Sequence, residues 1–198
     1  MATNNLIYQL TNTTPENGEN IIRRTWIAPI GLQVSGATRA AASNSLPVDV
    51  IVLDAANESV VINFPIPIDM DLDPGSLVLR AGVMVGLVSG SSTPSLDVDL
   101  DTITAIRAGA TTLNGGVAAI TPPSTTATEL STIGDIQTIE YDLSATIAAL
   151  ADPLAVGDAL AIEIDAAAVD GTSPVAHLYG AYVEYGSMVV AALVANRS

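Results

Sequence analysis

Hydrophobic and polar residues alternate strictly along several short stretches of this chain. The clearest stretch follows a Gly157-Asp158 turn, where residues 160–165 alternate between Leu or Ile and Ala, Glu or Asp. Successive side chains of a β-strand point to opposite faces, so this pattern predicts a strand with one face in a core and one in water. Residues 179–185 repeat the pattern after a turn at 170–174, which predicts a second strand, and the two together look like the closing strands of an antiparallel sandwich.

The same period-two signal recurs upstream, and turn residues separate its occurrences. The upstream segments predicted to be strands are residues 48–53, 60–64, 77–88, 96–106 and 136–143. Asn114-Gly115-Gly116 predicts a hairpin turn, and residues 144–150 predict one short helix. Many short strands with almost no helical periodicity favour an all-β fold, an antiparallel β-sandwich.

The N-terminal quarter of the chain has a different character. A turn cluster occupies residues 11–18, and small polar residues fill 37–45. A segment of this kind contributes little core of its own, so we expect residues 1–45 to form an extended N-terminal arm. Residues 46–198 then form a single sandwich domain.

The composition adds a constraint on the surface. The 198-residue chain is 49% hydrophobic and only 14% charged, whereas a typical soluble domain has about 25% charged residues. One interpretation is a compact β-protein rich in Thr, Ser and Ala. We favour the other, in which much of the surface is buried against other chains, because permanent interfaces resemble a core cut in half.

The charge balance argues against two classes of partner. The formal net charge is −15, and all six basic residues are arginine. Nucleic-acid binding requires a basic surface that neutralises phosphates, and docking on an anionic membrane requires the same. We therefore expect neither nucleic acid nor membrane as a partner. The chain has no cysteine, which excludes disulfides and cysteine-based zinc sites.

The sequence offers no catalytic constellation. His177 is the only histidine and lies in a strand-like segment, and no Gly-x-Ser-x-Gly motif is present. A hydrolytic triad needs a histidine, a nucleophile and a carboxylate together. We expect a structural or surface role for His177, no enzymatic activity, no catalytic residue and no cofactor.

Two acidic triplets resemble the start of a calcium-binding loop. They are Asp69, Asp71 and Asp73, and Asp97, Asp99 and Asp101. An EF-hand loop needs Gly at position 6 and Glu at position 12. The first triplet has Pro74 and Arg80 there, and the second has Thr102 and Ala108. We interpret each triplet as the solvent face of a strand and assign no metal site, leaving a bound cation as the open alternative.

One short segment has the composition of an interaction site. Arg23 and Arg24 are two of the six arginines, and they stand beside Trp26, the only tryptophan. Arginine and tryptophan are enriched at the energetic centres of protein interfaces. The sequence therefore predicts that these three residues bind a partner. The alternative is an arginine pair on a solvated edge and a tryptophan that covers the domain's own core.

Residues 60–186 carry a series of short motifs in a fixed order. They are Phe64-Pro65-Ile66-Pro67, Pro74-Gly75-Ser76, the long strand 77–88, Gly157-Asp158, Asp170-Gly171-Thr172 and Val183-Glu184-Tyr185. This part of the chain resembles the jelly-roll domain of phage virion proteins of the capsid decoration, or cement, type.

The resemblance implies a function as well as a fold. It implies a jelly roll in a non-enzymatic virion protein that lies on the outer capsid surface and stabilises the shell. The expected partners are the major capsid protein and the chain itself, as a homotrimer, with the N-terminal arm gripping the capsid. Two alternatives stay open. One is another virion component, a minor capsid or tail/fibre protein, and the other is a carbohydrate- or calcium-binding β-sandwich module.

Overall fold

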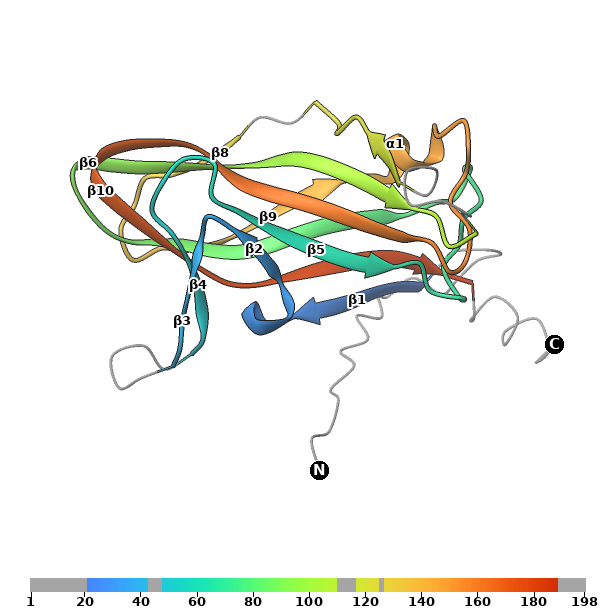
Figure 1. The fold of residues 1–198 in the computed structure, drawn as a ribbon, viewed down its shortest axis with the longest axis horizontal. Helices are drawn as coiled ribbons and strands as arrows, with labels where there is room; N and C mark the ends of the chain where they lie inside the picture. The colour runs from blue at the N-terminus through green and yellow to red at the C-terminus, as the bar shows by residue number, and fades with distance from the viewer. Residues whose placement is uncertain (1–20, 43–47, 110–116, 125–126, 189–198) are drawn as a thin grey trace.

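The computed structural model describes residues 21–42, 48–109, 117–124 and 127–188, and nearly all of them lie in β-strands or their connections (Figure 1). Two strands, β6 (Leu79–Ile106) and β10 (Ala159–Ser187), are 28 and 29 residues long. The shorter elements are β1 (Ile21–Ile27), η1 (Pro29–Gly31), β2 (Gln33–Ser35), β3 (Thr38–Ala40), β4 (Val50–Leu53), β5 (Ser59–Pro65), β7 (Val117–Ile120), β8 (Thr128–Leu130), β9 (Ile136–Asp142) and α1 (Ser144–Ala148). No helix in these ranges is long enough to cross a membrane.

Strands β6 and β10 form one antiparallel ribbon that runs along the molecule and back. Leu79 pairs with Tyr185 at one end of the register, and Ile106 pairs with Ala159 at the other. Both strands bend back at the same end of the molecule (Figure 1). The bend in β10 contains Gly171 with a φ of 84°, a left-handed conformation that glycine adopts without steric cost.

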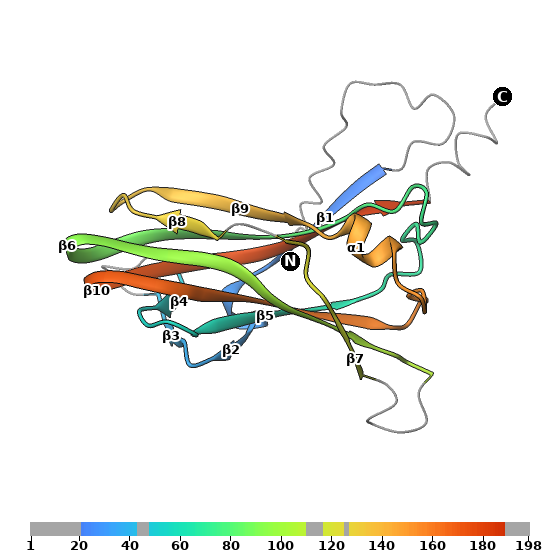
Figure 2. The same cartoon turned by 90° about the horizontal axis from the view of Figure 1, so that it is seen from above.

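The bend divides the ribbon between two layers. In the first sheet, the first half of β6 and the second half of β10 lie between β9 on one side and β1 and β4 on the other. In the second sheet, the remaining halves lie between β7 and β8 on one side and β5, followed by β2, on the other. A ribbon wound into two antiparallel layers is a jelly-roll β-sandwich, so the predicted fold class is confirmed (Figure 2).

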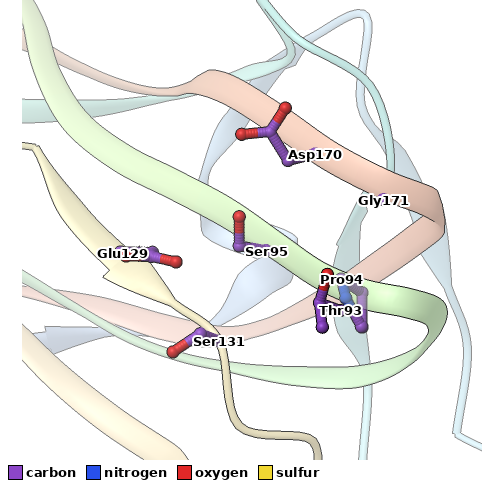
Figure 3. A pocket seen from close by; sticks show the side chains of 7 residues that line it. All are labelled: Thr93, Pro94, Ser95, Glu129, Ser131, Asp170 and Gly171. Carbon is purple, nitrogen blue, oxygen red and sulfur yellow. The ribbon is translucent and has the colours of Figure 1, made fainter.

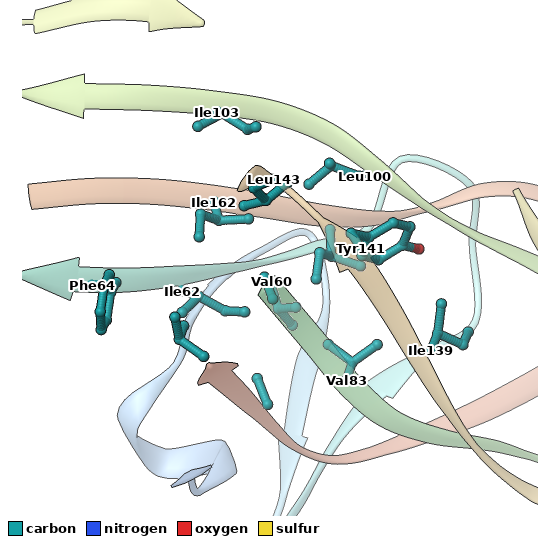
Figure 4. Packing of buried hydrophobic residues seen from close by; sticks show 14 of the residues in the cluster. Val60, Ile62, Phe64, Val83, Leu100, Ile103, Ile139, Tyr141, Leu143 and Ile162 are labelled. Carbon is teal, nitrogen blue, oxygen red and sulfur yellow. The ribbon is translucent and has the colours of Figure 1, made fainter. Parts of the chain in front are cut away.

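The core lies between the inner faces of the two sheets. Leu160, Ile162 and Ile164 are at most 1% exposed, so the alternation identified their inner face correctly. Figure 4 shows core residues of the second sheet, from β5, β10 and the second half of β6, together with those of β9 and the first half of β6 in the first sheet. Tyr141 of β9 donates a hydrogen bond from its hydroxyl to the carbonyl of Val98 at 3.1 Å, which links the two sheets through the core.

The structure moves the boundary of the predicted arm. Strand β1 pairs with β10 along its whole length, from Ile21 opposite Ser187 to Ile27 opposite Ala181. Strands β2 and β3 pair with β5 and β4. Residues 21–40 therefore belong to the sandwich instead of preceding it, because their extended backbone completes the sheet edges. The first 20 residues of the predicted arm lie outside the described residues.

Some of the predictions for single elements are confirmed, and others are wrong. The helix expected at 144–150 is present as α1, and the strands expected at 60–64 and 136–143 are present as β5 and β9. The loop expected at 89–95 is instead the bend within continuous β6, and the connection expected at 118–131 contains β8 and most of β7. The predicted Asn114-Gly115-Gly116 turn lies outside the described residues.

The turn before β10 is fixed by the buried carboxylate of Asp158. It accepts hydrogen bonds from the backbone N–H groups of Ala155 and Ala108, both at 2.9 Å, and from Nη1 of Arg107 at 3.0 Å. Burial by itself would raise the pKa of Asp158, but these hydrogen bonds and the Arg107 charge lower it below its usual value. One side chain therefore ties together the end of β6 and the start of β10.

We expect Asp158→Ala to lower the free energy of unfolding by about 3 kcal/mol, because it removes three charge-assisted hydrogen bonds. Asp152→Ala is the matched control, since the Asp152 side chain is 86% exposed and pairs with the same arginine. Urea denaturation at neutral pH measures both.

The contribution of Asp158 also depends on pH with a definite sign. Because folding lowers the pKa of Asp158, its contribution is complete above about pH 4, the usual value for an unfolded aspartate, and is lost as the pH falls through the folded value. The difference between wild type and Asp158→Ala should therefore shrink under acidic conditions. A difference that stays constant down to strongly acidic pH would contradict this role.

Candidate functional site

The outer face of the first sheet carries a row of four charged residues. Reading across the register, Arg24 of β1 stands opposite Glu184 of β10, Glu184 opposite Arg80 of β6, and Arg80 opposite Asp142 of β9. Directly paired residues of antiparallel strands share a face, so the four side chains lie side by side. Charges of alternating sign thus cross the whole sheet.

A second row runs parallel to the first. Trp26 stands opposite Tyr182, Tyr182 opposite Gly82, and Gly82 opposite Glu140. The ring centroids of Trp26 and Tyr182 are 5.1 Å apart with an interplanar angle of 55°. We call this region the Trp26 face, and it consists of Arg24, Trp26, Arg80, Gly82, Glu140, Tyr182 and Glu184.

The charged groups of the Trp26 face are paired with one another. Nε of Arg24 donates a hydrogen bond to Oε1 of Glu184 at 2.6 Å, and Nη1 of Arg80 lies 3.6 Å from Oε2 of the same carboxylate. Glu184 is buried, so the two arginines neutralise a carboxylate that has lost most of its contact with water. The guanidinium of Arg24 also lies 4.1 Å from the centre of the Tyr182 ring, a cation–π contact.

The hydroxyl of Tyr182 is held protonated. It donates to Oε2 of Glu140 at 2.8 Å. Burial raises the pKa of Tyr182, and the hydrogen bond and negative charge of Glu140 raise it further, so the hydroxyl remains a donor near neutral pH. Tyr182 is only 1% exposed, whereas Trp26 above it is 50% exposed. The face therefore presents an accessible indole on a fixed base.

The structure separates the three residues that the sequence grouped as partner-binding. Arg24 and Trp26 lie together on the Trp26 face. Arg23 alternates to the other side of β1, where its Nη1 forms an ion pair with Asp69 at 2.9 Å. The partner-binding role of all three residues stays a prediction.

The sequence did not identify the rest of this face. The residues that it did not assign to an interaction site are Arg80, Gly82, Glu140, Tyr182 and Glu184. The alternation within residues 179–185 could have placed Tyr182 and Glu184 on the outer side of their strand. The alternation could not show that β1 pairs with this strand, because Arg24 and Glu184 are 160 positions apart in the sequence.

The sequence predicted that the first acidic triplet lies on the solvent face of a strand, and the structure shows that this prediction is wrong. Asp69 accepts a hydrogen bond from the hydroxyl of Ser187 at 2.8 Å, and Asp71 accepts one from Ser76 at 2.6 Å. Both lie in the connection between β5 and β6, which forms only an isolated bridge at Met70. These carboxylates fix a loop, and Met70 between them is buried, since it is 1% exposed.

The second triplet lies on β6 as predicted, with Val98 and Leu100 buried between its members. On the outer face of the second sheet, Asp165 of β10 stands opposite Asp99. Burial raises the pKa of Asp165 to about 6, and repulsion from Asp101, Asp99 and Glu163 adds to the effect. In the described part of the chain, no three such side chains are positioned to hold a metal ion.

His177 takes part in no catalytic arrangement within the described residues. Its ring lies 6.3 Å from that of Tyr179 in an edge-on contact, and burial lowers its pKa. It makes no hydrogen bond to any serine or carboxylate in these ranges. The structural or surface role expected of His177 stays a prediction.

An open polar hollow of about 550 Å³ lies at the bend of the ribbon (Figure 3). It is lined by Thr93, Pro94, Ser95, Glu129, Ser131, Asp170 and Gly171. The lining contains hydroxyls and carboxylates and lacks an aromatic side chain. A ligand here would have no aromatic ring to stack on, so the Trp26 face is the stronger candidate.

Comparisons with known proteins show only remote similarity. No protein-family model matches the sequence, and no curated protein sequence matches it significantly. Similar solved structures include the CBM36-1 domain of a multidomain xylanase from the hindgut metagenome of Trinervitermes trinervoides, at 13% identity over 83% of this chain and 98% of that one, with a TM-score of 0.43.

Two further structures show that the similar proteins are of different kinds. The family 11 carbohydrate-binding module of the cellulosomal cellulase Lic26A-Cel5E of Clostridium thermocellum has 11% identity over 92% of this chain and 93% of that one, with a TM-score of 0.34. A structure of infectious bursal disease virus, Gt strain, has 11% identity over 89% of this chain and 37% of that one, with a TM-score of 0.36. Similarities of this size do not assign a family.

The raised pKa of Asp165 predicts how the stability of the protein depends on pH. Because folding raises the pKa of Asp165 to about 6, the folded protein gains stability as the pH falls through 6. Asp165→Asn should therefore stabilise the protein at pH 8 by about 1 kcal/mol, a value reduced by partial exposure to solvent, and have little effect near pH 4. Urea denaturation at both pH values tests this.

Asp170→Asn is the matched control, because Asp170 lies on the same strand opposite the neutral Ser95. It should change stability little at either pH. Equal effects of the two substitutions would show that general charge reduction, and not local repulsion, is responsible.

Proposed function

We propose that this chain is a non-enzymatic structural protein that binds another protein through the Trp26 face. The observation that carries the proposal is the half-exposed indole of Trp26 on its base of Tyr182, beside the paired guanidinium of Arg24. Tryptophan, tyrosine and arginine dominate the binding energy of protein interfaces. An indole that is already fixed loses little conformational entropy on binding.

The polar groups of the Trp26 face favour a protein partner over a sugar. Arg24, Glu140 and Glu184 are already engaged with other side chains of the face. A sugar site needs hydrogen-bonding groups that are free to contact hydroxyls, and usually several exposed aromatic rings. Among the large hydrophobic residues of the described ranges that are exposed, Trp26 is the one aromatic.

The setting that we propose is the outer surface of a virus capsid. The jelly-roll fold and the resemblance of residues 60–186 to phage decoration proteins support it, and so does the low charged fraction of 14%. The partners would be the major capsid protein and the chain itself, as a homotrimer. Many such contacts on a symmetric shell would add up by avidity and hold neighbouring subunits together.

The decisive substitution is Trp26→Ala. Shells assembled from the major capsid protein of the same genome are mixed with the purified chain and sedimented. We expect wild-type chain to co-sediment and Trp26→Ala to bind about 30-fold more weakly, because a central interface tryptophan contributes about 2 kcal/mol. Val117→Ala is the matched control, since Val117 is 51% exposed on β7 of the other sheet.

A carbohydrate-binding module is the second candidate, and the exposed indole also favours it because sugar rings stack on such surfaces. Affinity electrophoresis in gels containing xylan or a mixed-linkage β-glucan tests it with the same variants. Retardation of wild type and Val117→Ala, but not of Trp26→Ala, together with no binding to shells, would replace the capsid proposal. Light scattering on the purified chain tests the proposed trimer separately.

A further inference from the structure

The base of the Trp26 face depends on a missing side chain. Gly82 of β6 lies beneath the Tyr182 side chain, and a Cβ atom at position 82 would be 2.4–2.6 Å from two ring carbons and the hydroxyl oxygen of Tyr182. Real Cβ atoms do not approach other heavy atoms so closely, so any other residue at position 82 would displace the ring. Gly82 is therefore a position of close approach within a strand.

The space above Gly82 lets one side chain span three strands. Tyr182 starts on β10, its ring crosses β6 over Gly82, and its hydroxyl reaches Glu140 on β9. Trp26 and the Arg24 guanidinium then contact the ring from β1, on the other side of β10. The order of contacts is Gly82, Tyr182, then Trp26 with Arg24.

We propose that Gly82 and Tyr182 are positioning residues that set the orientation and exposure of Trp26, and with them the fit of the Trp26 face to its partner. Gly82 lies two strands away from β1 and acts only through the ring of Tyr182. Displacing the ring removes the surface on which the indole lies. What the face binds rests on the function proposed above, whereas the pose of Trp26 does not.

The chain supplies its own probe, because Trp26 is the only tryptophan. In Gly82→Ala we expect the Trp26 emission maximum to shift to longer wavelength and its quenching by acrylamide to increase, because the indole loses its packing against Tyr182. Gly109→Ala is the matched control, since a Cβ there meets no atom within 4 Å. Circular dichroism and the urea midpoint establish that each variant is folded.

The double variant separates positioning from a general loss of stability. If Gly82 acts through Tyr182, Tyr182→Leu should shift the Trp26 emission as Gly82→Ala does. Adding Gly82→Ala to Tyr182→Leu should then produce no further shift. An additive shift in the double variant, or unchanged emission in a folded Gly82→Ala, would overturn the proposal. Tyr182→Leu alone provides the test if Gly82→Ala does not fold, and unchanged emission there would likewise overturn it.

Binding gives the second readout. In the shell co-sedimentation assay, Gly82→Ala should lose affinity as Trp26→Ala does, while Gly109→Ala should keep it. If no chain binds shells, the proposed function fails, and the fluorescence result still decides the role of Gly82. If wild type and Gly82→Ala bind equally well despite shifted emission, the claim that the pose of Trp26 sets the fit is wrong.

Discussion

The backbone pairing between β6 and β10 is the constraint on which the rest of the structure depends. Each strand has two halves in different sheets, so the same pair of strands, with register shifts near the bend, sets the pairing at the centre of both layers. A slip of one residue in either half would move the core side chains of the strand that slips, within that half, to the outside. The shorter strands then add to edges that the ribbon has already set, and β1 takes its register from β10 in this way.

The sequence predicted the alternating strands of the core, because a strand that is half buried must alternate, and alternation is local. Residues 160–165 show this, since every second side chain is in the core. The sequence did not predict that residues 89–95 continue β6 around the bend. Gly, Ser, Thr and Pro in that segment have the composition of a loop. The strand continues there because β10 bends beside it, which is a property of the pair and is not visible in either segment alone.

The same difference between a local pattern and the pairing of distant strands explains which residues of the Trp26 face the sequence did not identify. Arg24 and Trp26 could be noticed because their residue types are rare in this chain. Gly82, Tyr182 and Glu140 are ordinary residues whose importance comes from register, since the first two meet only when β6 lies beside β10. Residues 21–40 were assigned to an arm for a related reason. Their strands have few core residues of their own and gain their place from partners far along the chain.

The two outer faces of the sandwich differ in charge, and this difference bears on which face can meet a partner. On the second sheet, burial raises the pKa of Asp165 to about 6, and repulsion from Asp101, Asp99 and Glu163 adds to the effect. On the first sheet, Arg24 and Arg80 compensate the carboxylates around them. For a chain of net charge −15, bringing a second copy or another acidic protein against the second sheet would add to an existing repulsion. The Trp26 face combines balanced charge with an exposed indole, so electrostatics and apolar contact favour the same face.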